Sequence, residues 1–221
     1  MTYDFELTEK VKKFCEKIGV DVLGLADPNL FDRFPKYNRP EFYLKESQTV
    51  IIIGMHLHDL VLDAWTRDPE FNKNFQFVDT ILEKLLYQIK DFLEKRGYDS
   101  ELISYKPGLY LKDAAALAGI GPIGRNNLII TEQFGSQVRL RALTTTAPLK
   151  CGTPILESKY CENCNKCIEA CPAQAFRDGK YNKNTCYAYQ ISHLRTLSDY
   201  TSIWCNVCIE SCPAGKNLQL D

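Results

Sequence analysis

The 221-residue sequence lacks the features that mark a membrane or secreted protein. No uncharged apolar run approaches the ~20 residues that cross a bilayer, and the opening MTYDFELTEK is acidic, without the apolar core of a signal peptide. The sequence also lacks an excess of charge of one sign: 27 basic and 28 acidic residues leave a net charge of -1, which provides no global field to attract nucleic acid or an anionic membrane. We therefore expect a cytoplasmic protein that contacts no membrane.

Cysteine is nearly absent from the first 150 residues and abundant after them. Cys15 alone precedes Cys151, and the remaining nine of the ten cysteines lie between Cys151 and Cys212. This imbalance predicts two domains, an α/β domain at 1–150 and a cysteine-bearing module at 151–221. Because a disulfide framework normally accompanies a signal peptide, we interpret the cysteines as metal ligands.

Hydrophobic periodicity predicts a mixed α/β architecture for the first domain. Helical spacing of apolar residues covers 7–18, 75–96 and 111–119, and strand patterns cover 20–26, 49–55 and 101–105. The uninterrupted apolar run at 49–55 is expected to be covered on both faces. Residues 119–135 and 137–149 are expected to pair as a hairpin around Gly135, and we identify no internal repeat.

The cysteines form two runs that are typical of iron-sulfur proteins. The first reproduces the bacterial ferredoxin run C-x2-C-x2-C-x3-C-P, in which the fourth cysteine binds the other cluster, and the second reads C-x2-C-x3-C-P. This exchange pattern predicts two 4Fe-4S clusters. The first cluster would be held by Cys161, Cys164, Cys167 and Cys212, and the second by Cys171, Cys205, Cys208 and one further cysteine.

Cys186 is the best candidate for that eighth ligand, because position 202, where a second ferredoxin run would carry another cysteine, is Ser202. The alternative metal is zinc, which also uses C-x2-C pairs. Eight sulfur ligands with two Cys-Pro endings match zinc ribbons poorly, so the spacing favours iron-sulfur clusters. We expect Cys15 to be a small apolar residue of its helix and Cys151 to be a free thiol.

Three glycines between residues 119 and 124 match G-x-G-x-x-G, the fingerprint of dinucleotide sites. That motif needs a strand before it and a helix at its last glycine, whereas here a helix is predicted before it and a β-like segment after it. We therefore reject a dinucleotide site. Gly121 and Gly124 are expected to allow a tight turn against a flat cofactor or a neighbouring backbone, with Arg125 and Asn126 as polar contacts.

Several stretches together resemble the epoxyqueuosine reductase family and its reductive-dehalogenase relatives. They are AALAGIGPIGRNNLIITEQFGSQVRLRALTTTAPL, then CENCNKCIEACPAQAF, CYAYQ and WCNVCIESCP, in the family's order. The resemblance implies that CYAYQ supplies the eighth cluster cysteine, Cys186. It also implies a nitroreductase-like α/β domain that holds cobalamin base-off, followed by a ferredoxin-like module whose two 4Fe-4S clusters reduce the cobalt to Co(I).

Two departures from the family pattern argue against queuosine chemistry. The tRNA-reducing members carry an acidic proton donor shortly before the alanine-rich helix, where this sequence reads SYKPG and has no carboxylate. They also continue into helical repeats that help to bind tRNA, whereas this sequence ends at Asp221. We expect a short form of the family for which tRNA is not a partner.

The segment where the family places its acid offers other proton donors. Tyr105 and Tyr110 are phenols, and a cation such as Lys112 would stabilise the phenolate that remains after proton transfer. The alternative is that Lys112 and Asp113 simply form the exposed first turn of a helix.

The leading hypothesis is an oxidoreductase in which two 4Fe-4S clusters feed a cobalamin that reduces a small molecule or a corrinoid substrate. Its electrons would come from a low-potential donor of ferredoxin or flavodoxin type. A second hypothesis is an electron-transfer protein that has no substrate of its own and reduces a partner such as a corrinoid protein. A third is a reductase that binds flavin in the same fold.

Overall fold

The computed structural model describes residues 3–68, 70, 73–177 and 179–215, and the chain divides into two compact units. The first unit comprises Met1–Met55, Ile81–Pro122 and Leu140–Leu156, and the second comprises His56–Thr80, Ile123–Arg139 and Glu157–Asp221. Each unit is therefore assembled from separate pieces of chain. Segments 56–80 and 123–139 fall before the expected boundary at residue 150 yet cluster with the C-terminal residues.

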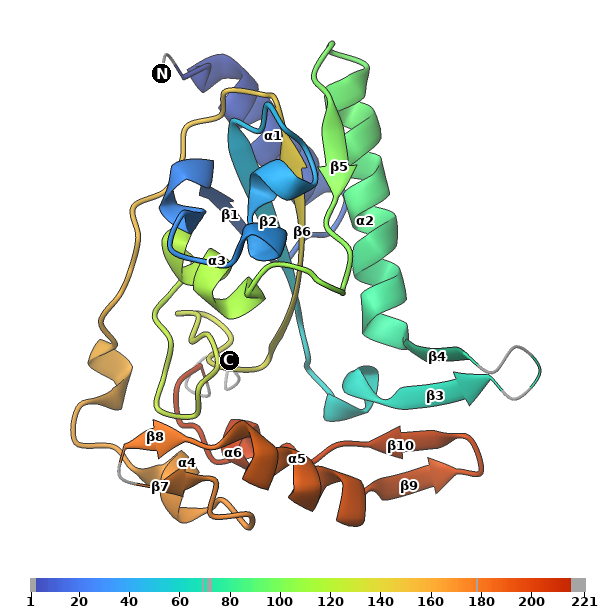
Figure 1. Cartoon of the computed structure of the whole chain (residues 1–221), viewed down its shortest axis with the longest axis vertical. Coiled ribbons are helices and arrows are strands. Elements are labelled where there is room, and N and C mark those ends of the chain that lie inside the picture. Colours follow the sequence, from blue (N-terminus) through green and yellow to red (C-terminus); the bar gives the residue numbers. More distant parts are fainter. Residues whose placement is uncertain (1–2, 69, 71–72, 178, 216–221) are drawn as a thin grey trace. The chain divides into compact units, whose positions relative to one another are not determined.

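The first unit is built on a four-stranded sheet with the order β1-β2-β6-β5 (Figure 1). Its strands are β1 (Val22–Ala26), β2 (Thr49–His56), β5 (Ser100–Leu102) and β6 (Val138–Thr145). β1 pairs antiparallel with β2, and β5 pairs antiparallel with β6. Val50, Ile51, Ile52 and Ile53 are completely buried, which is the two-sided cover that the apolar run predicts.

Three helices complete the first unit close to their predicted positions. They are α1 (Phe5–Lys17), α2 (Phe77–Glu94), which runs alongside β5 in Figure 1, and α3 (Leu111–Leu117). The Asp4 side chain caps α1 by accepting a hydrogen bond from the Leu7 N–H, and Gly19, at a φ of 85°, follows its end. The expected loop after β1 contains three short 3-10 helices, η1 (Pro28–Phe31), η2 (Lys36–Asn38) and η3 (Pro40–Phe42).

The second unit contains a sheet that the sequence patterns did not predict. Its order is β4-β3-β10-β9, formed by β3 (Trp65–Asp68), β4 (Lys73–Gln76), β9 (Arg195–Ser198) and β10 (Thr201–Ile203). A small hairpin pairs β7 (Phe176–Arg177) with β8 (Lys180–Tyr181). The remaining elements are η4 (Leu60–Asp63), η5 (Lys159–Cys161), α4 (Lys166–Glu169), α5 (Lys183–Ser192) and α6 (Val207–Glu210).

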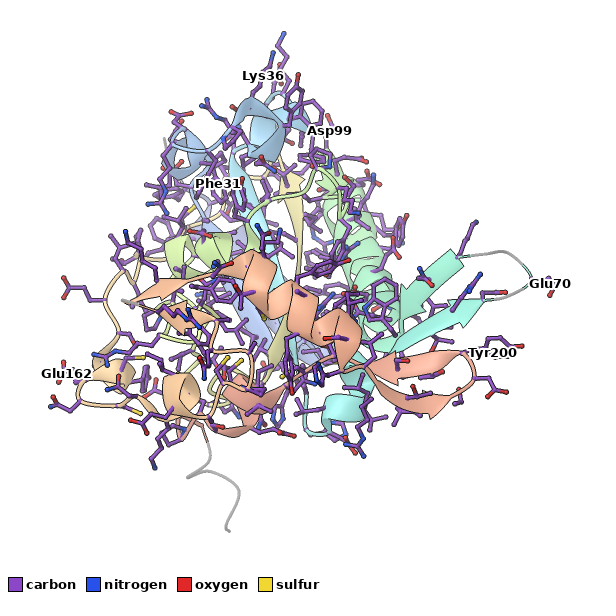
Figure 2. The ribbon with its side chains drawn as sticks, turned by 60° about the horizontal axis from the view of Figure 1, so that its bottom comes forward. Phe31, Lys36, Glu70, Asp99, Glu162 and Tyr200 are labelled. Atoms are coloured by element: carbon purple, nitrogen blue, oxygen red, sulfur yellow. The ribbon has the colours of Figure 1, made fainter. Side chains whose placement is uncertain are left out.

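Figure 2 shows Glu162, next to Cys161 in the sequence, at one end of the second unit, and Glu70 and Tyr200 on the opposite side. Among the described residues, no helix combines the length and the apolar character that a bilayer crossing requires.

The prediction of a hairpin around Gly135 is wrong. Residues 119–137 form turns with two isolated bridges, Ile123 to Ile129 and Thr131 to Gly135, and β6 lies between β2 and β5 instead. The segment cannot form a regular ladder because Pro122 has no N–H group and Asn127, at a φ of 60°, takes a left-handed turn conformation.

The structure also corrects the expectation that the chain has no internal repeat. CNKCIEACP at 164–172 and CNVCIESCP at 205–213 form the same turn-and-helix unit. Asn165 has φ and ψ of -120° and 8°, and Asn206 has -116° and 11°. Ala170 and Ser211, after the two helices, match equally closely. Sequence periodicity does not indicate this repeat, because the repeated segment is much shorter than the ~20–50-residue periods of repeat proteins.

Arg139, at the start of β6, joins three elements of the second unit. Its guanidinium lies 3.4 Å from Asp63 Oδ1 and 3.0 Å from Asp79 Oδ2, and it also donates to the Gln76 side chain. The Arg139, Asp63 and Asp79 side chains are only 22%, 15% and 19% exposed. Burial raises the pKa of Asp63, and Arg139 opposes that rise.

We expect Arg139→Met to lower the free energy of unfolding by about 2–4 kcal/mol, because it leaves two largely buried carboxylates without their cation. Thermal unfolding measures this change. Lys95→Met is the matched control, because the Lys95–Asp91 pair has side chains 69% and 62% exposed. Equal stability of the two variants would contradict the interpretation of Arg139 as a structural ion pair.

Candidate functional site

The two repeated turns bring four thiols together around one hollow. α4 and α6 pack against each other, and each follows a cysteine and carries the next cysteine of its run. The hollow is lined by Cys161, Cys164, Cys167 and Cys212, together with Arg125, Asn126, Ile130, Tyr160 and Pro213. Cys167 and Cys212 are 7% and 8% exposed. The four thiols of the expected first cluster therefore converge.

The charged neighbours that affect the pKa of Cys167 are the other three thiols of this group. Burial raises the pKa of Cys167, and the thiolates of Cys212, Cys161 and Cys164 raise it further. A thiolate in this position is disfavoured by poor solvation and by repulsion from its neighbours. A cation bound at the centre would reverse both effects, because a coordinating thiol is deprotonated by the metal charge.

The other four cysteines form a second group. Burial raises the pKa of Cys208 to about 12, and Cys205, Cys186 and Cys171 are the first charged neighbours that add to the rise. Burial also raises the pKa of Cys205, which again has Cys186 and Cys171 as neighbours. Cys186, on α5, thus lies among the thiols of the expected second cluster.

The donors that the two groups offer a metal are thiols. Among the described residues, no set of three or more His, Cys, Asp or Glu side chains is gathered closely enough for one metal ion. Thiolates are ligands of iron-sulfur clusters and of zinc, so the donor type agrees with the predicted clusters and does not distinguish them from zinc.

Arg125 and Asn126 contact the turns that carry both cysteine groups. The Arg125 N–H donates to Cys161 Sγ at 3.4 Å, and its guanidinium donates to the Cys164 carbonyl at 3.3 Å and to the Asn165 side chain. Asn126 Nδ2 donates to the Cys208 carbonyl at 3.5 Å. The polar contacts of these two residues are therefore with the cysteine-bearing turns. Hydrogen bonds to sulfur and a nearby cation also favour the reduced state of a cluster.

The glycines predicted to bind a cofactor are buried. A Cβ at Gly124 would lie 2.4 Å from Ile130 Cδ1, so this glycine permits close packing within its own turn. Helix α3 ends before the glycine segment, and the described residues from 118 to 137 contain no helix. This order agrees with the rejection of a dinucleotide site.

Tyr181 is a neighbour of the second group that the sequence analysis missed. Burial raises its pKa well above the usual range, and a hydrogen bond with Cys186 adds to the rise. The tyrosine therefore caps one thiol of the group. Of the two remaining cysteines of the chain, Cys15 is 1% exposed on α1, as expected for a small apolar residue, and Cys151 is half-buried, with burial raising the pKa of its thiol to about 11.

The predicted proton donors line one pocket of the first unit. Its volume is about 260 Å³, and its lining includes Tyr105, Tyr110 and Lys112. Lys112 is half-buried, and burial lowers its pKa, whereas the alternative interpretation expects an exposed residue. Asp113 lies 3.9 Å from Arg33 instead of in the pocket lining. Arg141 also lines the pocket. The sequence analysis did not identify it, because in the run VRLRALTT it has the pattern of an ordinary strand residue.

Curated proteins similar to this chain are epoxyqueuosine reductases and reductive dehalogenases. An epoxyqueuosine reductase from Listeria monocytogenes is 30% identical over 214 residues, covering 83% of this chain and 56% of that protein. A tetrachloroethene reductive dehalogenase from Dehalobacter restrictus is 36% identical over 101 residues, covering 45% of this chain and 18% of that protein. The chain thus spans about half the length of the epoxyqueuosine reductases that it matches. No protein-family model matches the chain.

Solved structures share its fold. Epoxyqueuosine reductase from Streptococcus thermophilus has a TM-score of 0.73 at 19% identity, covering 96% of this chain and 66% of that chain. An epoxyqueuosine reductase in complex with an epoxyqueuosine-modified tRNA-Tyr stem loop has a TM-score of 0.72 at 22% identity. The match covers 98% of this chain and 67% of that chain. A reductive dehalogenase whose structure suggests a mechanism for B12-dependent dehalogenation has a TM-score of 0.68 at 15% identity. The match covers 95% of this chain and 32% of that chain. The expectation that tRNA is not a partner gains no support here, since one neighbour is a tRNA complex.

We expect Cys186→Ser to abolish one cluster and leave the other, because it removes a thiol from the second group only. The measurement is electron paramagnetic resonance of the dithionite-reduced protein, purified without oxygen, in which about half of the integrated signal should be lost. Cys151→Ser is the control, because Cys151 belongs to neither group. Full retention of both signals in Cys186→Ser would show that the eighth ligand is another residue.

Proposed function

Because the chain belongs to the epoxyqueuosine reductase-like family, we propose that it is an iron-sulfur oxidoreductase. Two 4Fe-4S clusters, held by the two groups of four cysteines, would pass low-potential electrons to a bound corrinoid, and the chain would reduce a substrate still to be identified. The observation that carries the proposal is the convergence of the eight cysteines in the pattern of ligand exchange.

The residues of the second unit suit single-electron transfer. Cys171 and Cys167 lie in the same turn but belong to different groups, so the two clusters would be linked by a few residues of chain. When bound, the clusters supply single electrons and the corrinoid a strongly reducing metal centre. The corrinoid is proposed from the family and from the B12 dependence named for one structural neighbour.

The pocket of the first unit favours an enzyme over a simple electron carrier. An electron carrier needs no substrate pocket, whereas Tyr105, Tyr110 and Lys112 line a pocket of about 260 Å³. We assign the proton donor to Tyr105 or Tyr110. The Lys112 ammonium would stabilise the phenolate, and the lowered pKa of Lys112 makes its own proton easier to transfer.

The electron donor would dock near the second cysteine group. The β7–β8 hairpin and the start of α5 form a groove whose described lining includes the cations Arg177, Lys180 and Lys183. Tyr181 lines the same groove and hydrogen-bonds with Cys186. An acidic face on a ferredoxin or flavodoxin would be attracted to these cations, which would place its cofactor close to the second cluster.

We expect the cluster-loaded chain, purified without oxygen, to bind hydroxocobalamin at a ratio of about one per chain and to shift its absorption spectrum toward the base-off form. The measurement is a spectrophotometric titration, with flavin mononucleotide titrated in parallel. Binding of flavin in place of cobalamin would support the flavin alternative. Binding of neither would contradict the proposed enzyme and favour an electron-transfer protein without its own substrate.

A further inference from the structure

Two buried N–H groups that have no hydrogen-bond partner flank Cys205. One is the indole Nε1 of Trp204, and the other is the amide Nδ2 of Asn206, a residue that is only 9% exposed. Within the described part of the chain, five buried side-chain nitrogen or oxygen atoms lack a partner, and these are two of the five. A buried donor without an acceptor is unfavourable, so two of them beside one cysteine need an explanation.

Helix capping does not account for the Asn206 amide. Asn206 directly precedes α6, where an asparagine side chain commonly accepts a hydrogen bond from a backbone N–H of the first turn. Asn206 makes no such bond. A cap would in any case use the side-chain oxygen, whereas the buried atom without a partner is the nitrogen, which can only donate.

The matching turn of the repeat differs at the same positions. Asn163 and Asn165 flank Cys164 as Trp204 and Asn206 flank Cys205, and both of these asparagines are exposed. The Asn165 side chain accepts a hydrogen bond from the Arg125 guanidinium. Because the backbone angles of the two turns agree closely, the burial of N–H donors is a property of the side chains around Cys205 and not of the turn itself.

Aromatic contacts position the Trp204 indole near a second thiol of the same group. Its ring centre lies 5.9 Å from that of Trp65 and 6.0 Å from that of Tyr187. Tyr187 directly follows Cys186 in α5. A buried indole N–H usually has a hydrogen-bond acceptor. The sulfide and thiolate sulfurs of an iron-sulfur cluster are acceptors of this kind, and hydrogen bonds to them help to set its reduction potential.

We propose that Trp204 Nε1 and Asn206 Nδ2 donate hydrogen bonds to sulfur atoms of the second 4Fe-4S cluster and thereby raise its reduction potential. The inference rests on the proposed function, which assigns that cluster to the second cysteine group. The cluster gains one electron from the low-potential donor and becomes more negative, so N–H donors stabilise its reduced form more than its oxidised form. The two residues therefore make this cluster easier for the donor to reduce.

The test is a redox titration of the cluster-loaded full chain, with a europium(II) chelate as reductant and electron paramagnetic resonance as the readout. The signal that Cys186→Ser removes identifies the second cluster. Asn206→Leu and Trp204→Phe each remove an N–H group and keep a side chain of similar shape. Each should lower the reduced-to-oxidised ratio of this cluster about tenfold at a given potential, which is a midpoint ~59 mV more negative for one electron.

Asn165→Leu is the matched control, because Asn165 has the same place in the other turn and is exposed. It should leave the midpoint of the second cluster unchanged. A second measurement begins from the unmodified sequence: with ¹⁵N in the asparagine side-chain amides, pulsed electron paramagnetic resonance of the reduced second cluster should detect a coupled ¹⁵N nucleus. The coupling should persist in Asn165→Leu and disappear in Asn206→Leu.

Unchanged midpoints in both variants, with iron and sulfide retained, would overturn the inference and leave the proposed clusters in place. Absence of the ¹⁵N coupling in the unmodified sequence, or a shift confined to the first cluster, would also overturn it. If only one variant shifts the midpoint, the donor role belongs to that residue and is rejected for the other. An unmodified chain that contains no iron and sulfide would reject the proposed function and the inference together.

Discussion

The gathering of eight buried or half-buried cysteine thiols is the constraint on which the second unit depends. Its two turns gather the sulfur atoms where solvation is poor, and the pKa of Cys167, Cys205 and Cys208 is raised in consequence. Beyond residue 156 the described chain buries few apolar side chains, namely Cys167, Ala175, Ile203 and Cys212, and α5 buries none. A stretch of chain with so few buried apolar side chains needs another source of stability, and metal-thiolate bonds supply it in many small domains.

The presence or absence of a counter-ion also distinguishes two arginines of β6. Arg139 has its carboxylates and stabilises the fold, whereas Arg141 on the same strand has none among the described residues. Three cations, Arg177, Lys180 and Lys183, line the groove that contains Tyr181, a neighbour of Cys186. The chain thus combines gathered thiols with cations that line a groove and a pocket.

Much of the first unit could be predicted because its signals are local. The helical period gives α1 and α2, and the apolar run gives β2, each within about two residues of the observed ends, which is better than single-sequence patterns usually allow. The sheet of β3, β4, β9 and β10 could not be predicted, because its strands are short and polar and join residues 65–76 to 195–203. Cysteine spacing predicted both thiol groups. The isolation of Arg141 could not be read from the sequence, since it depends on which side chains fail to reach it.

The central claim is that these eight thiols bind two cubanes of iron and sulfide. Its most direct test is the quantification of iron and acid-labile sulfide in the full chain purified without oxygen. The account predicts about eight iron and eight sulfide per chain. Stoichiometric zinc without sulfide would contradict it.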